Sequence, residues 1–149
     1  MGLKTIRFLA LLFTALALAP ALAHLLELLN KINLSREAYL TVQQIYRGWA
    51  LLGFVVVGAL LANLILTIMV RTKPKVFVLN LITFLCIVGA QVVFWMFTYP
   101  ANQATSNWTM LPENWLHLRT QWEYSHAAGA VLNVIAFITL ILSVLVQDE

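Results

Sequence analysis

APALAHLLELLNKI, residues 19–32, decides whether this chain begins with a removable leader or with a membrane-spanning helix. Residues 21–23 form an A-x-A tripeptide after a basic start and an apolar run, as in a secretory signal. The apolar character does not end there, because leucines continue to Leu29. A signal peptide has an apolar core of only about 7–15 residues, followed by a change in composition. The sequence therefore favours a retained first helix, with cleavage before His24 as the alternative.

The whole chain is far more apolar than a soluble domain of its size. Hydrophobic residues make up 62% and charged residues 10% of its 149 positions, against roughly 45–50% and 25% in soluble domains. Further apolar blocks cover residues 48–70, 76–99 and 127–146. Each supplies about the 20 residues with which a helix crosses roughly 30 Å of hydrocarbon. The sequence therefore predicts an integral membrane protein whose helices contact a lipid bilayer.

These blocks predict an all-α fold, with a single transmembrane domain over residues 1–149 built as a four-helix bundle. We expect helices at about 5–30, 46–70, 76–99 and 121–146, with outer loops at about 31–45 and 100–120. The basic residues flank the helices, as membrane anchors do. The net charge of +3 therefore gives no indication of a nucleic-acid partner.

The basic residues also predict the orientation of the bundle. A basic turn, RTKPK at residues 71–75, joins the second and third helices, and the chain begins with Lys4 and Arg7. Because lysine and arginine are enriched in cytoplasmic loops, this side is predicted to be cytoplasmic, together with both termini. The opposite side carries four basic residues against these five, namely Lys31, Arg36, Arg47 and Arg119. The expected location is the bacterial inner (cytoplasmic) membrane.

Two pairs of histidine and glutamate are predicted to lie at the same depth. His24-x-x-Glu27 comes near the end of the first helix, and Glu123-x-x-His126 comes near the start of the fourth. On antiparallel helices, both glutamates then lie on the outer side of their histidines. At 1.5 Å per residue, each histidine lies roughly 7–9 Å below the outer end of its helix.

Other polar side chains fall on helix faces at this level, because residues three and four positions apart share a face. The stripes are Gln91, Trp95, Thr98 and Asn102 on the third helix and Arg119, Glu123, His126 and Asn133 on the fourth, while Tyr46 and Arg47 begin the second. Ionisable groups at such depth normally face the bundle interior, since exposure to lipid costs several kcal/mol. We therefore predict a polar pocket open to the outer side.

The histidines and glutamates of this pocket are candidate metal ligands. A single non-haem ion held by His24, Glu27, Glu123 and His126 fits the preferences of iron(II) or zinc. A carboxylate-bridged pair of metals is disfavoured, because no Asp or Glu occurs between residues 38 and 112. The alternatives are a metal-free catalytic pocket, a purely structural polar network, bis-histidine ligation of haem, and a path for protons or ions.

Two segments carry a family resemblance, HLLELLNKINLSREAYLTVQQIYRGWA at residues 24–50 and NWTMLPENWLHLRTQWEYSHAAGAVLN at residues 107–133. Together they resemble the small four-helix membrane proteins grouped with the fungal anthrone oxygenases, many of whose bacterial members are of unknown function. The resemblance implies oxidation of a phenolic, anthrone-like carbon to a quinone by O₂, with no cofactor required. A resemblance of this kind supports a shared fold more strongly than a shared substrate.

A cofactor-free oxygenase gives each pocket residue a role. A histidine takes a proton from an acidic phenol or methylene, an arginine stabilises the resulting oxyanion, and the glutamates orient the imidazoles. The catalytic candidates are His24, His126, Glu123 and Arg119, and the candidates for binding a small hydrophobic aromatic substrate are Tyr46, Arg47, Gln91, Trp95 and Trp122.

A non-catalytic role is the competing interpretation. A small membrane chain without a soluble domain also suits an accessory subunit of a larger membrane complex. An accessory subunit should co-purify with a partner, whereas an enzyme should be stable as a monomer or homo-oligomer.

Overall fold

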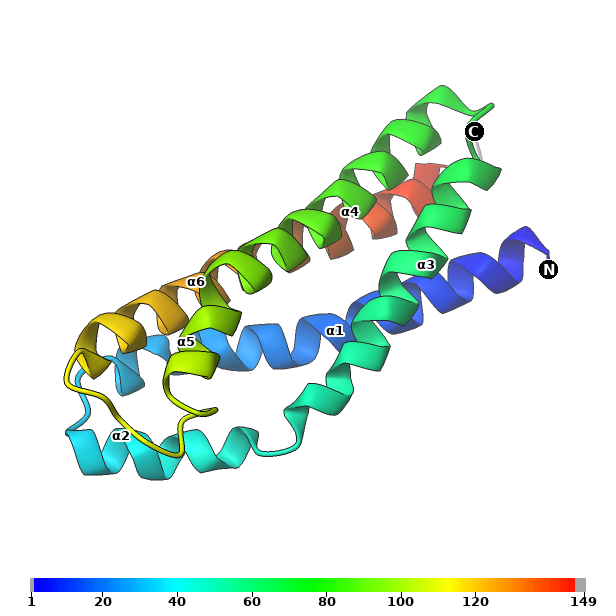
Figure 1. Cartoon of the computed structure of the whole chain (residues 1–149). Helices are drawn as coiled ribbons and strands as arrows, with labels where there is room; N and C mark the ends of the chain where they lie inside the picture. The colour runs from blue at the N-terminus through cyan, green and yellow to red at the C-terminus, as the bar shows by residue number, and fades with distance from the viewer. Residues whose placement is uncertain (1, 147–149) are drawn as a thin grey trace.

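The computed structural model describes residues 2–146, and that range contains helices and turns but no strand. Four helical segments are long and apolar enough to cross a membrane, and they form a bundle (Figure 1). They run over Leu3–Lys31, Trp49–Met69, Pro74–Ala104 and Trp115–Leu145. The prediction of an all-α membrane bundle with four spans is thereby confirmed.

The first helix, α1 (Leu3–Lys31), passes without interruption through the A-x-A tripeptide of residues 21–23 and through Pro20. It packs against α3 (Gly53–Met69) and α6 (Trp115–Leu145), and α6 also packs against α4 (Pro74–Val93). A short turn joins α3 to α4, and Pro74 begins α4 at a position where its missing N–H costs no hydrogen bond. Both chain ends and this turn lie at one end of the bundle (Figure 1).

The opposite end is more helical than the predicted outer loops. Residues 31–45 contain α2 (Arg36–Gln43) and one 3-10 turn, η1 (Gln44–Tyr46), and a second 3-10 turn, η2 (Trp49–Leu52), leads into α3. The Ser35 hydroxyl caps α2 by accepting from the Ala38 N–H at 3.3 Å, which explains where this helix begins. The fourth span begins at Trp115, about six residues before the predicted start. These extra turns cover the outer end of the bundle.

The third span is interrupted by a π-helical turn. After α4 the chain makes the turn η3 (Phe94–Thr98) and continues as α5 (Tyr99–Ala104). A π turn shifts the phase of the helix, so residues beyond it leave the face that a regular α-helix would give them. Trp95, the second residue of the turn, points outward with 59% of its surface exposed, whereas Thr98, its last residue, is buried against the Ser125 hydroxyl at 2.7 Å.

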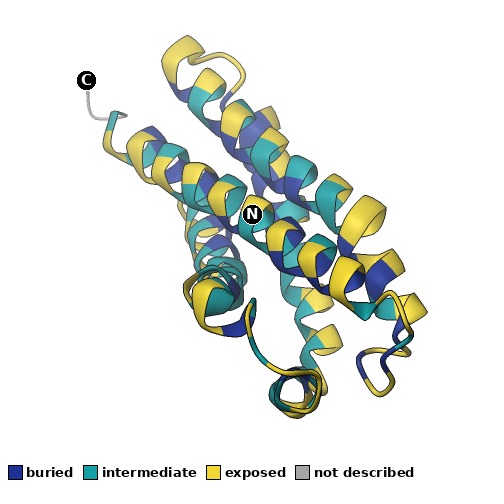
Figure 2. Cartoon of the chain, turned by 90° about the vertical axis from the view of Figure 1, so that its left-hand side faces the viewer, coloured by how far each residue is buried: buried dark blue, intermediate teal, exposed yellow. Residues whose placement is uncertain are grey.

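Buried positions line the faces that the helices turn toward one another, and exposed apolar positions cover the outside (Figure 2). At the end that carries the termini the core is apolar and close-packed, and it includes Ile6, Ala10, Leu66 and Leu140. Asn63 ties two helices together by donating to the Thr14 hydroxyl at 2.9 Å. Small side chains and isolated polar contacts of this kind are how helices associate within a membrane.

Gly58 marks the closest approach of α3 to α1, and we predict that it tolerates no side chain. A Cβ atom there would lie 2.7 Å from the ring of Phe13, so Gly58→Ala should cost about 1–3 kcal/mol of unfolding free energy through overpacking. Gly89→Ala is the matched control, because its Cβ would meet only Leu132 at an ordinary 3.5 Å. Unfolding by sodium dodecyl sulfate in mixed micelles measures both. Equal stability of the two variants would contradict the close contact.

Candidate functional site

The two membrane histidines lie against each other at the end of the bundle away from the termini. The ring centroids of His24 on α1 and His126 on α6 are 4.0 Å apart, with 31° between the ring planes. His24 is buried, with 6% of its surface exposed. The matching depths inferred from the sequence therefore correspond to direct contact between the two imidazoles.

Aromatic rings surround this histidine pair. Trp122 lies edge-on to both imidazoles, with centroids 5.1 Å from His24 and 4.2 Å from His126. Tyr46 and Trp49, which follow α2, approach His24 at 4.5 and 5.5 Å. The predicted ring-binding residues Tyr46 and Trp122 are thus part of the site, and Trp49 joins them.

A buried lysine holds the two glutamates together. The Lys31 ammonium lies 3.2 Å from Glu123 Oε1 and 3.6 Å from Glu27 Oε2. Lys31 retains only 3% of its surface exposed, and Glu123 none. The sequence had placed Lys31 only among the basic residues of the outer side. Its contact with Glu123 crosses from α1 to α6 and is the main ion pair of the site.

Hydroxyl groups extend the ion pair into a network. Lys31 Nζ donates to the Tyr46 hydroxyl at 2.7 Å, and that hydroxyl donates to the Glu27 carboxylate. The Tyr39 hydroxyl donates to Glu123 Oε1 at 2.9 Å and accepts from Gln43 Nε2 at 2.6 Å. Burial and a neighbouring carboxylate raise the pKa of both phenols, so these tyrosines act as hydrogen-bond donors.

Sequence reasoning missed Tyr39 and Gln43, although a signal was present. Tyr39, Gln43 and Tyr46 are spaced by four and then three residues, which places them on one face of a helix. Residues 31–45 were predicted to be a loop, so the spacing was not interpreted as one face of a helix. The same face of α2 and η1 now supplies three polar groups to the site.

The predicted arginines do not enter the histidine pair. Arg119 is buried, but its guanidinium donates to the Leu34 carbonyl at 2.8 Å and lies 4.7 Å above the Trp115 ring. Arg47 is exposed, because the chain turns at Gly48, whose φ of +90° suits glycine. Of the remaining ring-binding candidates, Gln91 is half-buried on α4, and Trp95 faces outward within the π turn.

The four candidate metal ligands do not form a metal site. Over residues 2–146, no group of three or more His, Cys, Asp or Glu side chains is placed to hold a metal ion. The physical reason is that the Lys31 ammonium already occupies the position between the Glu27 and Glu123 carboxylates. The ligand set His24, Glu27, Glu123 and His126 therefore does not fit a metal ion as the site is arranged.

Bis-histidine ligation of haem does not fit either. Two metal–nitrogen bonds of about 2 Å on opposite sides of an iron separate the nitrogens by about 4 Å, and the ring centres by more. The His24 and His126 centroids are only 4.0 Å apart with nearly stacked planes, which leaves no room for a macrocycle between them.

Three buried polar atoms of the site have no hydrogen-bond partner among the residues that the structure describes. They are Glu123 Oε2, His24 Nδ1 and Gln43 Oε1. Glu123 Oε2 is an acceptor, and a neutral histidine accepts through one of its ring nitrogens. Buried polar groups are normally paired, so such atoms indicate where water or a ligand binds. The site thus offers acceptors to a molecule that donates hydrogen bonds.

Comparisons of the chain with protein-family models, with curated proteins and with solved structures gave no match.

We predict that Lys31 and Glu123 are energetically coupled. Lys31→Met leaves a buried carboxylate without its counter-ion, so the free energy of unfolding should fall by about 3–5 kcal/mol. Adding Glu123→Gln removes the uncompensated charge and should recover part of this loss. Unfolding by sodium dodecyl sulfate in mixed micelles measures the double-mutant cycle, with Lys73→Met at an exposed turn position as the control. Strict additivity of the two site substitutions would contradict the coupling.

Proposed function

We propose that this protein is a membrane-embedded oxidoreductase that oxidises a small hydrophobic aromatic molecule bearing an acidic phenol or methylene group. The single observation that carries the proposal is the histidine pair, whose buried His24 Nδ1 has no partner in the described part of the chain, beside the Lys31 ammonium. A base next to a fixed cation is the arrangement that proton abstraction from such a molecule requires.

In this proposal the histidines supply the base. An unpaired imidazole nitrogen takes the proton from the substrate, and the stacked partner ring together with Trp122 fixes its orientation. Correct placement of a general base contributes typically 10²–10⁴-fold to a rate. His24 is the better candidate of the two, because its free nitrogen is the one that lies buried in the site.

Lys31 takes the role that sequence analysis assigned to an arginine. Its ammonium is held by Glu123 and Glu27 and lies 4.5 and 4.6 Å from the centres of the Tyr46 and Trp122 rings. A cation fixed in a poorly hydrated site stabilises the developing oxyanion more strongly than it would in water. The Tyr46 hydroxyl, already bonded to Lys31, is a second donor for that oxygen.

The overall reaction is balanced with O₂ as the oxidant. The anion formed by proton loss is electron-rich and reduces O₂, and an anthrone-type CH₂ becomes C=O. Two C–H bonds and the O–O bond break, one oxygen atom enters the carbonyl and the other leaves as water. The four electrons lost by carbon are the four gained by oxygen. The resemblance to the anthrone oxygenase-like proteins favours this substrate class and a reaction without a cofactor.

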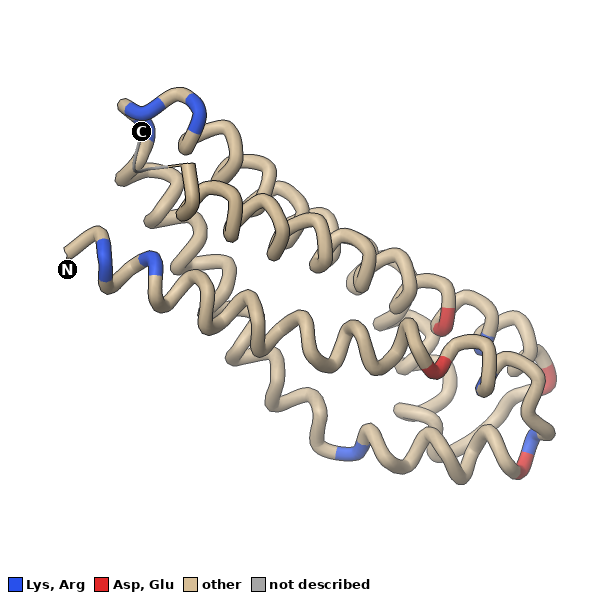
Figure 3. Tube along the Cα trace, turned by 180° about the vertical axis from the view of Figure 1, so that it is seen from behind, with Lys and Arg blue, Asp and Glu red and all other residues tan. Residues whose placement is uncertain are grey.

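We further propose that the site opens toward the outer side of a bacterial cytoplasmic membrane. Among the described residues, Figure 3 shows basic charge at the end with the termini and charges of both signs at the other. Of the basic residues at the mixed end, Lys31 and Arg119 are buried inside the protein, so only Arg36 and Arg47 face the surroundings. The imbalance in surface basic charge is therefore larger than the sequence count indicated, which supports cytoplasmic termini.

Cysteine labelling in spheroplasts tests this orientation. Cys86, the single cysteine, lies within α4, so Cys86→Ser provides a background without thiols. Glu37→Cys and Thr72→Cys then place one thiol at an exposed position on each end of the bundle. We expect a membrane-impermeant maleimide to label Glu37→Cys in intact spheroplasts and Thr72→Cys only after lysis. The reverse pattern would invert the orientation.

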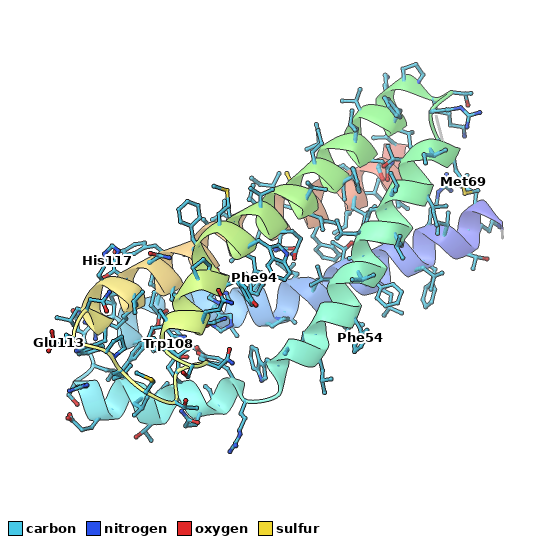
Figure 4. The ribbon with its side chains drawn as sticks, viewed as in Figure 1. Phe54, Met69, Phe94, Trp108, Glu113 and His117 are labelled. Carbon is cyan, nitrogen blue, oxygen red and sulfur yellow. The ribbon has the colours of Figure 1, made fainter. Side chains whose placement is uncertain are left out.

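Oxygen uptake with 1,8-dihydroxyanthrone as the probe tests the chemistry. His24→Ala and His126→Ala should each slow O₂ consumption and quinone formation at least 100-fold, the lower end of the general-base contribution. The matched control is His117→Ala, an exposed histidine on the same helix as His126, which should retain the full rate (Figure 4). A chelator should not change the rate of the wild-type protein.

Unchanged turnover in both membrane-histidine variants would refute the role of the histidine pair. Loss of turnover on chelation would show instead that the reaction depends on a metal. Circular dichroism of each variant distinguishes a catalytic loss from unfolding.

A further inference from the structure

The segment after α5 covers the outer end of the bundle and inserts one aromatic side chain into it. This strap, residues 105–111, links α5 to the approach of α6 and exposes Ser106, Asn107, Thr109 and Met110. Trp108 is its inward-pointing ring, with 3% of its surface exposed (Figure 4). The strap therefore holds a single indole in the interior while most of its other residues face solvent.

The Trp108 indole occupies a slot built from other elements. Its ring lies edge-on between Tyr39 of α2, at 5.2 Å, and Trp122 of α6, at 5.7 Å. Its Nε1–H donates to Asn102 Oδ1 at 3.0 Å, and the same oxygen accepts from Trp122 Nε1 at 2.8 Å. The slot thus accepts a planar aromatic ring and offers it one hydrogen-bond acceptor.

The backbone that places Trp108 there is strained. Ser106, Asn107 and Trp108 have φ values of +50°, +56° and +61°, three successive non-glycine residues in the left-handed region. Each such residue is disfavoured by contact between its Cβ atom and the backbone, and the strain persists only while other contacts hold it. Those contacts include the Trp108 N–H to the Thr105 hydroxyl and Gln44 Nε2 to the Trp108 carbonyl. A backbone change at residues 106–108 that accompanied withdrawal of the indole would release this strain.

We propose that the slot is an outer binding site for planar aromatic molecules that carry an O–H or N–H donor, and that Trp108 is its built-in occupant. A ligand binds by displacing the indole outward and by donating to Asn102 Oδ1 in its place. A surface hollow of about 350 Å³ lies at the edge of the strap and provides space for the displaced ring. Its lining residues are Leu40, Thr41, Gln44 and Thr109.

This site is distinct from the place of reaction. Trp122 forms one wall of the slot and, through its ring, contacts His24 and His126. The Trp122 ring therefore separates a molecule in the slot from the two imidazoles, and the slot lies on the outer side of the bundle. The inference rests on the proposed function for the class of ligand, and it assigns Asn102 the role of selecting hydroxylated rings.

Binding of 6-fluoro-2-naphthol, followed by ¹⁹F NMR in detergent micelles, tests the proposal without any turnover. Wild-type protein should bind the naphthol saturably, and Trp108→Ala should bind it at least about tenfold more tightly, because no indole has to be displaced. Trp108→Phe, which keeps a ring but lacks the N–H donor, should also bind more tightly than the wild type. Asn102→Leu in the Trp108→Ala background should lose at least about tenfold.

The methyl ether of the same naphthol is the matched control, because it partitions equally into micelles but cannot donate a hydrogen bond. Equal affinity for ether and naphthol, or binding to Trp108→Ala but not to the wild type, would overturn the proposal and leave Trp108 as a fixed core residue. His117→Ala, an exposed position outside both sites, should keep wild-type affinity for the naphthol. If the naphthol binds but no anthrone is turned over, the proposed reaction is wrong and the slot stands. If anthrone is turned over but naphthol binding does not depend on Asn102, the slot is wrong and the proposed reaction stands.

Discussion

The ion pair between Lys31 and Glu123 is the constraint on which the half of this bundle away from the termini depends. Both charges are buried, and a buried charge is tolerated in a membrane protein only with a partner and hydrogen bonds. Because the two residues belong to α1 and α6, the requirement ties these helices together at one register, at the end of the bundle away from the termini. That register brings His126, one turn along α6 from Glu123, into contact with His24, two turns along α1 from Lys31. The ion pair therefore fixes the geometry of the histidines.

The covering elements follow from the same requirement. An ammonium and two carboxylates need more hydrogen bonds than they can give each other, and α2 with η1 supplies them through Tyr39, Gln43 and Tyr46. The segment between the first two spans is consequently helical and lies across the end of the bundle rather than in solvent. The apolar core of the opposite half is held by small side chains and single amide or hydroxyl contacts.

The sequence predicted the spans, the common depth of the histidines and the polar character of the site, because these depend on hydrophobic length and helical period alone. It did not predict the partner of Glu123, since the contact with Lys31 joins residues 92 positions apart. Trp95 is exposed and lies inside the π turn at residues 94–98, a local departure from the 3.6-residue period on which the predicted helix face was counted. Arg47 is turned away from the site because the chain turns at Gly48. The left-handed backbone conformation of Gly48 cannot be inferred from residue spacing.

The two proposed sites have a common chemistry in their hydrogen-bond acceptors. The inner site presents Glu123 Oε2 and His24 Nδ1, and the outer slot presents Asn102 Oδ1, all able to accept a hydrogen bond. A hydroxylated ring supplies a donor to each of them. A buried acceptor without a donor costs free energy, so rings that lack an O–H or N–H group should bind less well at both proposed sites. The reaction proposed above keeps the phenol groups of the substrate, so on these proposals one chemical feature, a donor on a planar ring, is selected both at the outer slot and at the histidine pair.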